Sequence, residues 1–573
     1  MSNIKTSDYV ADFLAAQGVS HVFEVVGGMI THLVDSIHTR GKVRLVSVHH
    51  EQAAAFAAEA MGRMTGVPGV ALATSGPGAT NLLTGIGSCY FDSSPAVFIT
   101  GQVNRAEQKG NRPIRQLGFQ ETDIVSVAKP LTKAAWSIQS PEELPARLVD
   151  AFSLAVSGRP GPVLLDIPMD VQRAKISAAP PQRTAPANLA SLAPTTPVEL
   201  FAALAQSQRP LVLIGGGIRS ARVTDLLRQF SIRVPIPVIH SLMAVDVLPH
   251  DHPLRIGMIG SYGNRWVNLG IARADLLLVL GSRLDVRQTG AMTDAFRGER
   301  KIFHVDCDAP EINNRVTGCT PIVSQLDPFL RATAAAAPHG LGWPKWLKEL
   351  NDLRQQWPDT AELRDVPGIN PNIFMHQLSR LSTQAAAYVA DVGQHQMWAA
   401  QSLELGPTQR FLTSGGMGAM GFALPAAIGA SFAAPDHPVV MIAGDGGFQL
   451  NLQELQTIVR NRLPLKLVIL NNGCHGMVRQ FQESYFSQQY ASTLWGYSAP
   501  DFAAVARAYG IAADTVSDPA AVDNALHRMG ADDQPYLLQV MINTFANAYP
   551  KIAFGHPLTE MEPFAKPLDM EGT

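Results

Sequence analysis

The sequence has few cysteines, no long apolar run and no excess of basic residues. Its 573 residues include four cysteines (Cys89, Cys307, Cys319 and Cys474). None forms a CxxC pair, so neither a disulfide framework nor a cysteine-rich zinc site is expected. No stretch approaches 18 uninterrupted apolar residues, and the N-terminus mixes polar and apolar residues, so we expect neither a transmembrane helix nor an export signal.

The charge balance also excludes classes of partner. Lysine and arginine total 45, aspartate and glutamate 48, and the net charge is -3. Such a chain lacks the positive electrostatic field that would attract nucleic acids or acidic lipids. We therefore expect a protein of the reducing cytoplasm whose partners are small molecules, with neither nucleic acid nor membrane among them.

Length and patterning predict an α/β protein with three doubly wound parallel sheets. A chain of 573 residues is long for one core, and 46% of its residues are hydrophobic. Strand, glycine turn and helix patterns recur in three regions, which we place at 1–175, 198–340 and 368–560. The Pro/Ala-rich stretch 176–197 and a polar segment ending near Pro367 are expected linkers, and the tail from Pro557 shows no periodicity.

The most informative stretch is 439–482. An apolar run (Val439 to Ile442) ends in a Gly-Asp-Gly-Gly turn, apolar positions then follow at helical spacing, and a second apolar run (Leu465 to Leu470) ends in Asn-Asn. Parallel strands of such a unit end at the same sheet edge, so Asp445 and Asn472 are expected to meet there.

These two side chains predict a cation site. A carboxylate (Asp445), an amide oxygen (Asn472) and a carbonyl from the next turn (Cys474) are hard oxygen ligands that suit Mg²⁺. The turn glycines Gly444, Gly446 and Gly447 let the backbone approach a diphosphate. A lone GDG is more often an ordinary strand-to-helix turn, and the paired asparagines after the next strand favour the cation site.

The first region begins with an expected amphipathic helix that Ser7-Asp8 would cap. Two strand-to-helix turns follow it and carry candidate residues. At the first of these turns, a strand from Val43 to Val48 leads to Glu51 at the start of an alanine-rich helix. An acid in a first helical turn is, by itself, explained by the helix dipole. The motif SGPGATN (75–81) then repeats the strand, glycine turn and helix plan.

The chain resembles the acetolactate synthase (acetohydroxyacid synthase large subunit) family of thiamin diphosphate enzymes over nearly its whole length. The signature is GDG followed about 25 residues later by NN. Further matching pieces, in family order, are HEQAAAFAAEAMGRMTG, SGPGATN, GFQETDIV, GRPGPVLLDIP, GSRLDVRQTG, DVGQHQMWAAQ, SGGMGAMGFALPAAIGA and HGMVRQFQ. The resemblance implies an N-terminal pyrimidine-binding domain, a central nucleotide-binding domain and a C-terminal diphosphate-binding domain, the first and last with one fold.

The resemblance also assigns roles to residues. Glu51 would activate the aminopyrimidine of thiamin diphosphate, Met420 would bend the cofactor, and Phe119 and Gln120 would face the substrate channel. Asp445, Asn472 and the Cys474 carbonyl would bind Mg²⁺. The remaining thiamin diphosphate residues would be Val392, Gly393, Gln394, His395, Gly418, Gly444, Gly446, Gly447, His475, Gly476 and Met477.

For the central domain the resemblance implies an FAD site. A strand, three glycines and a helix begin the region, although the triple glycine lacks the full dinucleotide fingerprint. The family positions present are Arg159, Gly215, Gly216, Gly217, Ser241, Leu242, Met243, Gly260, Ser261, Arg283, Asp285, Arg287 and Asp306. A vestigial fold that binds ADP or nothing is the alternative, since the expected reaction has no redox step.

The expected reaction is decarboxylation of pyruvate and transfer of the two-carbon unit to a second carbonyl. The chain has Phe481, Met169, Met29 and Asn104 where the biosynthetic enzymes usually carry tryptophan, lysine, a small residue and proline. These four changes around one channel suggest a different second substrate. The ending FGHPLTEMEP resembles relatives that act on nucleotide-linked keto sugars, such as the yersiniose-pathway flavoenzyme. The acceptor thus stays open between a second pyruvate and a larger ketone.

Two other classes remain as alternatives. A plain 2-oxoacid decarboxylase, or a C–C hydrolase, is disfavoured because His49-His50 precedes Glu51 directly, which is not the usual place for a histidine pair. A regulatory protein on a dead synthase fold is disfavoured because Glu51, Asp445 and Asn472 are all present.

The resemblance finally implies a homodimer or homotetramer. In the family arrangement Glu51 of one chain and Asp445 and Asn472 of another complete each site. The small faces of the helices expected at 52–60 and 415–432 suit close packing at such an interface.

Overall fold

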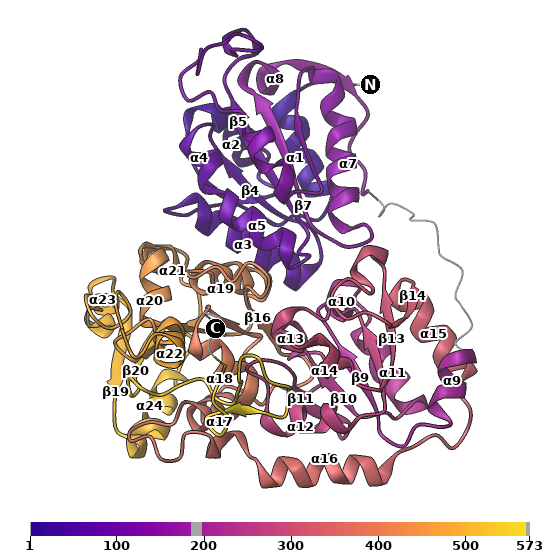
Figure 1. The fold of residues 1–573 in the computed structure, drawn as a ribbon. Helices are drawn as coiled ribbons and strands as arrows, with labels where there is room; N and C mark the ends of the chain where they lie inside the picture. Colours follow the sequence, from indigo (N-terminus) through magenta and orange to yellow (C-terminus); the bar gives the residue numbers. More distant parts are fainter. Residues whose placement is uncertain (1, 185–197, 569–573) are drawn as a thin grey trace. The chain divides into compact units, whose positions relative to one another are not determined.

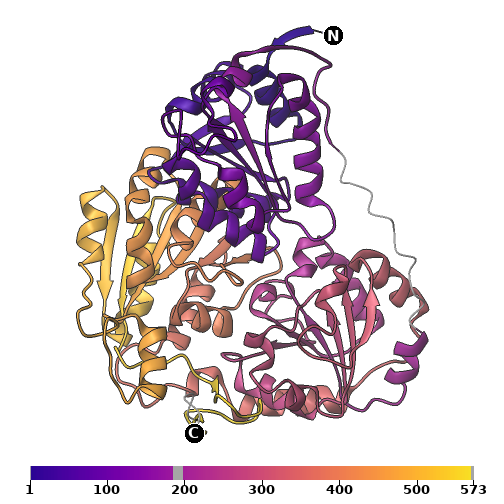
Figure 2. The same ribbon diagram turned by 45° about the horizontal axis from the view of Figure 1, so that its top comes forward.

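The computed structural model describes residues 2–184 and 198–568. They form three six-stranded parallel sheets, each with helices on both faces (Figures 1 and 2). The α/β class and the three doubly wound sheets predicted from the sequence are confirmed. By packing, the chain divides into two compact units. Of the described residues, unit 1 holds 2–184, 414–441 and 448–465, and unit 2 holds 198–413, 442–447 and 466–568.

The first sheet follows the order β3-β2-β4-β5-β7-β6. Its strands are β2 (His21–Val25), β3 (Arg44–Ser47), β4 (Gly69–Ala73), β5 (Ala96–Gln102), β6 (Ala134–Ser137) and β7 (Pro162–Pro168). Its helices are α1 (Thr6–Ala16), α2 (Thr31–Arg40), α3 (Glu51–Thr65), α4 (Pro77–Asn81), α5 (Leu83–Phe91), α6 (Ile124–Ala128), α7 (Leu144–Val156) and α8 (Met169–Arg173).

The central sheet follows the order β11-β10-β9-β12-β13-β14. Its strands are β9 (Pro210–Ile214), β10 (Val238–His240), β11 (Arg255–Met258), β12 (Leu276–Leu280), β13 (Lys301–Asp306) and β14 (Thr320–Val323). Its helices are α9 (Val198–Leu204), α10 (Gly217–Ser220), α11 (Thr224–Arg233), α12 (Arg265–Arg273), α13 (Val286–Thr289), α14 (Thr293–Arg297), α15 (Leu326–Ala336) and α16 (Pro344–Gln356).

The third sheet follows the order β16-β15-β17-β18-β20-β19. Its strands are β15 (Ala387–Ala390), β16 (Arg410–Leu412), β17 (Val439–Gly444), β18 (Leu465–Asn471), β19 (Ala512–Val516) and β20 (Tyr536–Met541). Its helices are α17 (Pro371–Leu381), α18 (Gln394–Ser402), α19 (Ala423–Ala433), α20 (Asp445–Phe448), α21 (Leu455–Asn461), α22 (Gly476–Tyr485), α23 (Phe502–Ala508) and α24 (Val522–Met529).

The first and third sheets share one topology. Replacing β2 to β7 by β15 to β20, in the same pairing, converts one strand order into the other. In each of these sheets the second strand lies on one side of the first strand and the third strand lies on the other side. This creates a topological switch point between β2 and β4 and between β15 and β17. The corresponding switch point of the central sheet lies between β9 and β12. Ligands of doubly wound sheets bind at the carboxyl ends of the strands at such points.

The structure corrects several sequence expectations. Helix α1 begins at Thr6 after Lys5, whose side chain makes no cap, so Ser7 and Asp8 lie inside the first turn instead of capping it, and the Thr6 hydroxyl donates to the carbonyl of Ala174. The stretch 176–197 is not wholly linker, because β8 (Lys175–Ala178) pairs with β1 (Ser2–Lys5), and its residues 185–197 lie outside the described residues. In the tail, β22 (Met561–Glu562) pairs with β21 (Lys551–Ile552).

Two expected features of the helices also differ. The helix after Gly447 is broken into α20, a 3-10 segment (Gln449–Glu454) and α21, because Asn451 leaves helical geometry and donates to the carbonyl of Gly421. The small faces of α3 and α19 pack against each other within the chain. A Cβ on Gly429 would lie 2.1 Å from the Ala57 carbonyl. These faces therefore give no separate support for a subunit interface.

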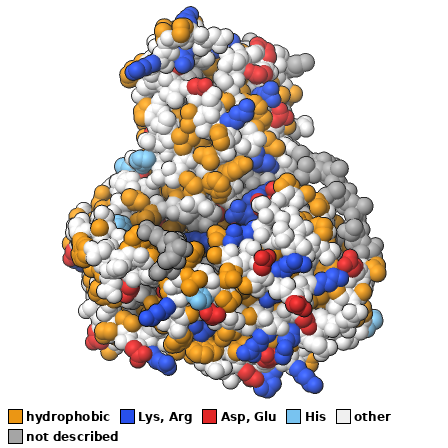
Figure 3. Space-filling model, in the orientation of Figure 1, with side chains coloured by type: hydrophobic (Ala, Val, Ile, Leu, Met, Phe, Trp, Pro, Cys, Tyr) orange, Lys and Arg blue, Asp and Glu red, His pale blue; other side chains and the backbone are white. Residues whose placement is uncertain are grey.

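The surface carries charges of both signs. Figure 3 shows lysine and arginine side chains interspersed with acidic ones, including along its lower edge over α16. None of the described helices is both long and apolar enough to cross a membrane.

Candidate functional site

The first half of the candidate site lies at the switch point of the third sheet. The turn after β15 carries Asp391 to His395, and the turn after β17 carries Gly444 to Gly447. The two turns are in contact at Gly444 and Gly447. A Cβ on Gly447 would lie 2.4 Å from Oδ1 of Asp391, and one on Gly444 would lie 2.9 Å from Nδ1 of His395. Any larger residue would separate the turns, so these glycines are required by packing.

Three oxygens converge beside these turns. Oδ1 of Asn472 lies 2.9 Å from the carbonyl oxygen of Cys474 and 3.3 Å from Oδ1 of Asp445. Rotating the amide by 180° would place an N–H toward both oxygens instead. Three acceptors without a hydrogen between them repel one another, and a cation at their centre removes the repulsion. The residues predicted from sequence to bind Mg²⁺ are thus brought together in the arrangement that a hard cation needs.

The environment of Asp445 is set by burial and by Tyr497. The Tyr497 hydroxyl donates to Oδ2 of Asp445 at 2.9 Å, and the Tyr497 ring lies edge-on to His475 with centroids 4.5 Å apart. Burial raises the pKa of Asp445 to about 6, against hydrogen bonds from Tyr497 and from backbone N–H groups that lower it. No group of three His, Cys, Asp or Glu side chains suited to a metal occurs among the described residues, so this site depends on one carboxylate and neutral oxygens.

One ring nitrogen of His395 is left for a ligand. His395 is 5% exposed, and its Nε2 has no hydrogen-bond partner within the described residues. Burial lowers the pKa of His395 to about 3, so the free ring is neutral. An orphaned buried nitrogen needs a partner. A nearby diphosphate would supply one and would favour the protonated ring, which fits the expected role.

The neighbouring side chains form a fixed network. The amide of Asn472 donates to Oε1 of Gln394 at 3.1 Å, and Gln394 donates to Oε1 of Gln480, also at 3.1 Å. Helix α22 begins at Gly476, where a Cβ would lie 2.0 Å from Oε1 of Gln394. The remaining predicted diphosphate residues of this half lie in the same turns, namely Val392, Gly393, Gly446, His475 and Met477.

The second half surrounds Glu51 in unit 1. Glu51 is the first residue of α3 and is 8% exposed. Nδ2 of Asn81 donates to its Oε2 at 2.9 Å, and a Cβ on Gly78 would lie 3.1 Å from its Oε1. Oε2 of Glu51 is therefore held by Asn81, and Oε1 faces the space that Gly78 leaves open because it has no side chain.

The turn after β4 links Glu51 to the predicted channel residues. A Cβ on Gly76 would lie 3.0 Å from Cβ of Gln120, and Gln120 has a left-handed backbone (φ 64°). Phe119 beside it is 78% exposed. An apolar ring presented to solvent next to a constrained glutamine fits a surface that contacts substrate.

Gly418 and Met420 lie in the loop before α19, also in unit 1. Oxygens of Asp92 accept hydrogen bonds from the backbone of Gly415 and Gly416 at 2.9 and 2.6 Å, which fixes the start of this loop. Met420 is half-buried and Gly418 has a left-handed backbone (φ 64°). The structure places these residues and Glu51 in one unit, and the oxygens of Asp445 and Asn472 in the other.

The histidine pair is accounted for by local structure. Nδ1 of His50 accepts from the backbone of Gln52 and caps α3, while the His49 backbone donates to Oε1 of Glu454 at 2.9 Å. Through these contacts both histidines stabilise the start of α3. They therefore give no support to a decarboxylase with a catalytic histidine pair.

The predicted FAD residues of unit 2 lie in the carboxyl-end loops of the central sheet. A Cβ on Gly215 would lie 2.2 Å from the carbonyl of Gly281, so Gly215 lets the turns after β9 and β12 touch at the switch point. The guanidinium groups of Arg283 and Arg287 make no ion pair within the described residues. The same edge carries Gly216, Gly217, Ser241, Leu242, Met243, Gly260, Ser261, Asp285 and Asp306.

Arg159 belongs to unit 1, where its Nε donates to Oγ of Ser93 at 2.9 Å.

Three of the four substitutions that separate this chain from the biosynthetic pattern lie at one edge of the first sheet. Met29, Asn104 and Met169 follow β2, β5 and β7 at the carboxyl edge of the first sheet. Two hydrogen bonds tie their loops together, from Arg105 to Asp170 (2.7 Å) and from Gln172 to the carbonyl of Met29 (2.7 Å). Phe481 lies on α22 in the other unit and contacts the ring of Tyr485.

Sequence reasoning missed two site residues. Asn81 ends the motif SGPGATN, so its position was within a recognised motif, but its hydrogen bond to Glu51 was not predicted. Tyr497 lies in an irregular loop 52 residues from Asp445, and nothing in the local pattern points to it.

Comparisons with known proteins agree across the chain. The family described as "Thiamine pyrophosphate enzyme, N-terminal TPP binding domain" matches residues 4–127, the one described as "central domain" matches 198–333, and the one described as "C-terminal TPP binding domain" matches 391–540.

Several curated relatives match nearly end to end. "Acetolactate synthase isozyme 2 large subunit" of Escherichia coli is 37% identical over 557 residues, which cover 97% of this chain and 98% of the relative. "Acetolactate synthase large subunit" of Pyropia yezoensis is 35% identical over 586 residues, with 99% and 97% covered. "Acetolactate synthase" of Arthrospira platensis is 37% identical over 572 residues, with 96% of each covered.

Proposed function

The chain belongs to the acetolactate synthase family of thiamine pyrophosphate enzymes, and from this premise we propose that it is a carboligase. It decarboxylates pyruvate and transfers the two-carbon unit to a second carbonyl compound. The observation that carries the proposal is the convergence of the oxygens of Asp445, Asn472 and Cys474 beside two glycine turns at a switch point.

In this proposal one half of the site holds the cofactor's charged end. Asp445, Asn472 and the Cys474 carbonyl would hold Mg²⁺, which would neutralise the charge of the diphosphate there. Nε2 of His395 lies beside the same turns and takes a phosphate oxygen as its partner. The other diphosphate residues are those of the turns after β15, β17 and β18 named above.

The other half moves a proton. Bound thiamin diphosphate supplies the nucleophilic carbon that carries out decarboxylation and carries the two-carbon unit. Asn81 holds Oε2 of Glu51, so Oε1 is the oxygen that shares a proton with the aminopyrimidine. Gly78 keeps that oxygen open, and Gly418 and Met420, in the loop before α19, would contact the cofactor.

We also propose an FAD site on the central sheet, where FAD would have a structural role. The free guanidinium groups of Arg283 and Arg287 and the glycine turn at the β9/β12 switch point support an anionic dinucleotide there. Arg159, which lies in unit 1, remains a family-based assignment. A vestigial site that binds ADP or nothing is the alternative.

The acceptor is either a second pyruvate or a larger ketone such as a nucleotide-linked keto-deoxysugar. The clustering of Met29, Asn104 and Met169 at one edge of the first sheet, in a chain that keeps Asp445 and Asn472, supports a change in substrate without a change in cofactor chemistry. Phe119 and Gln120 are the proposed channel residues. A plain 2-oxoacid decarboxylase is the second candidate.

For its organisation we propose domains at 1–175, 198–340 and 368–560, a cytoplasmic location, and a homodimer or homotetramer in which two chains complete each site. The family membership supports the assembly. All four cysteines are free, which agrees with a reducing compartment.

The test is product analysis. Holoenzyme with ¹³C-labelled pyruvate is followed by NMR, first alone and then with added ketones. A carboligase gives CO₂ and a product that joins the two-carbon unit to pyruvate or to the ketone. Release of acetaldehyde in amounts equal to CO₂, with no joined product from either acceptor, would assign the protein as a decarboxylase.

A further inference from the structure

A cluster of basic side chains lies at the edge of the central sheet opposite the glycine turn. Arg255 is the first residue of β11, so it lies at the amino edge, whereas Gly215 to Gly217 follow β9 at the carboxyl edge. Arg255 is 8% exposed, and its buried Nε has no partner. Within the described residues its guanidinium makes neither a hydrogen bond nor an ion pair.

Two more donors accompany Arg255. Nη2 of Arg354, on α16, lies 3.3 Å from Nε2 of His250, and the Arg354 guanidinium lies over the ring of Trp266. No acid pairs with Arg354 in the part of the chain that the structure describes. Nε1 of Trp266 donates to the carbonyl of Ile256, the residue after Arg255, so the Arg354 guanidinium lies close to Arg255. Burial, and then the charge of Arg354, lowers the pKa of Arg255 to about 10.

The contact with Arg354 fixes the proton on His250. Arginine only donates, so Nε2 of His250 accepts and the proton is on Nδ1. That N–H is buried and has no acceptor among the described residues. Burial, Arg255 and Arg354 lower the pKa of His250 to about 4, so it is neutral. Two arginines and one imidazole N–H therefore lack an acceptor.

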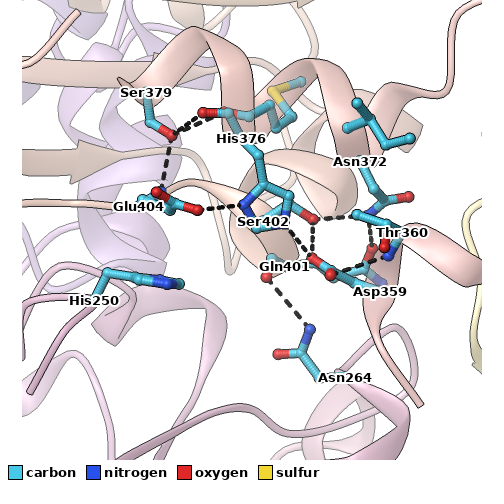
Figure 4. Close-up of polar contacts among 12 residues, drawn as sticks. His250, Asn264, Asp359, Thr360, Asn372, His376, Ser379, Gln401, Ser402 and Glu404 are labelled. Atoms are coloured by element: carbon cyan, nitrogen blue, oxygen red, sulfur yellow. Dashed lines mark hydrogen bonds and ion pairs between the residues drawn. The ribbon is translucent and has the colours of Figure 1, made fainter. Parts of the chain in front are cut away.

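Glu404, an acid that acts electrostatically on His250, is already engaged. Figure 4 shows Glu404 and His250 with no hydrogen bond drawn between them. Its carboxylate instead binds Nδ1 of His376 at 2.8 Å and both Nε and Nη2 of Arg380 at 2.9 and 2.6 Å. The positive charge of Arg255 and Arg354 thus stays unbalanced.

A buried guanidinium without an acceptor is costly, and such groups in folded proteins are normally paired. We propose that Arg255, Arg354 and Nδ1–H of His250 form an oxyanion site that takes a phosphate group. Two uncompensated arginines match an anion that carries nearly two negative charges at neutral pH, and planar guanidinium groups suit phosphate oxygens. The site is separate from the carboxyl-edge loops and from the catalytic turns.

The experiment measures binding of inorganic phosphate to holoenzyme saturated with thiamin diphosphate, Mg²⁺ and FAD, so that cofactor sites do not take up the probe. Calorimetry is compared with chloride at matched ionic strength. Phosphate is expected to bind, and Arg255→Gln and Arg354→Gln are each expected to weaken binding by roughly tenfold or more, the scale of a charged hydrogen bond. Glycerol 3-phosphate is the second probe. Equal binding indicates the phosphate group of a metabolite, and binding of phosphate alone indicates the free ion.

Arg300→Gln is the matched control. Arg300 is also 8% exposed, and burial lowers its pKa to about 10, but it lies before β13 and outside the cluster. Its phosphate affinity is expected to match wild type. No phosphate binding beyond the chloride control, or equal affinity in wild type and both cluster variants, would overturn the proposal. Equal loss in Arg300→Gln would also do so. Arg354 is half-exposed, so its variant keeps the test valid if Arg255→Gln fails to fold.

Discussion

The hydroxyl of Tyr497 donates to Oδ2 of Asp445 at 2.9 Å, while Oδ1 of the same carboxylate lies 3.3 Å from Oδ1 of Asn472. One oxygen of Asp445 is therefore held by a neutral donor, and the other is directed at the oxygen cluster. Such an outer partner orients a metal ligand and is part of the site's affinity.

Tyr497→Phe removes that donor and keeps the ring against His475. We expect the variant to fold normally and to need roughly tenfold more Mg²⁺ to retain thiamin diphosphate, the lower end of the range for loss of an outer-shell contact. Cofactor retained after gel filtration at graded Mg²⁺ is the measurement, because it does not depend on turnover. Tyr509→Phe, on the loop after α23, is the control. An unchanged Mg²⁺ requirement would show that the hydroxyl does not orient Asp445.

Glu51→Gln tests the proton-transfer residue. The amide keeps the volume and can still accept from Asn81, but it cannot exchange the proton, so turnover is expected to fall by roughly 10²- to 10⁴-fold with fold and cofactor binding retained. Glu59→Gln is a matched control, because Glu59 is a buried acid on the same helix bonded to Ser94. Near-normal turnover of Glu51→Gln with bound cofactor would remove Glu51 from the mechanism.

His376 links three segments of unit 2. Its Nδ1 lies 2.8 Å from Glu404 and its Nε2 lies 3.0 Å from Asp359, so both ring nitrogens donate to carboxylates (Figure 4). Burial alone would lower the pKa of His376, but its bonds to Asp359 and Glu404 raise it above its ordinary value. Burial would likewise raise the pKa of Glu404, but Arg380 and His376 hold it at about 2.

The sign of the pH dependence follows. The folded-state pKa of His376 is above its unfolded value near 6.5, so its stabilisation is complete below about pH 6.5 and is lost as the pH rises through the folded pKa. His376→Gln is expected to lower the free energy of unfolding by about 1–3 kcal/mol at pH 6 and by less at pH 9. Urea unfolding followed by fluorescence at both values measures this, with exposed His437→Gln as control. A difference that grows from pH 6 to pH 9 would contradict the assignment.

The sheets could be predicted because parallel strands that are buried on both faces have continuous runs of apolar residues in the sequence. Val439 to Ile442 and Leu465 to Leu470 became β17 and β18 with ends shifted by at most two residues. Helix ends depended on distant contacts. The start of α1 is fixed by Ala174, 168 residues away from Thr6, and the break at Asn451 by Gly421, so no local pattern contained them.

The meeting of Asp445 and Asn472 could be predicted from the sequence, because these residues end neighbouring strands of one sheet. Tyr497 could not, since it reaches Asp445 from an irregular loop whose path the sequence does not encode locally. The basic cluster around Arg255 was also missed, because β11, α16 and the loop carrying His250 meet only through tertiary packing.

The proposed shared site predicts complementation between inactive chains. If Glu51 and Asp445 of each centre come from different chains, a mixed dimer of Glu51→Gln and Asp445→Ala carries one doubly defective and one intact site. Random exchange at equal amounts makes about half the dimers mixed, so activity is expected to recover to about a quarter of wild type. Native mass spectrometry verifies exchange. No recovery after verified exchange would place both residues in the same chain's site.

We propose that the oxygen cluster binds the cofactor while Glu51 acts on it, and titration calorimetry of thiamin diphosphate in the presence of Mg²⁺ separates these two roles. Asp445→Ala removes the only carboxylate of the cluster, so it is expected to abolish measurable binding, whereas Glu51→Gln and the exposed-site control Asp436→Ala bind as wild type does. Wild-type affinity in Asp445→Ala, or equal loss of binding in Glu51→Gln, would contradict the account.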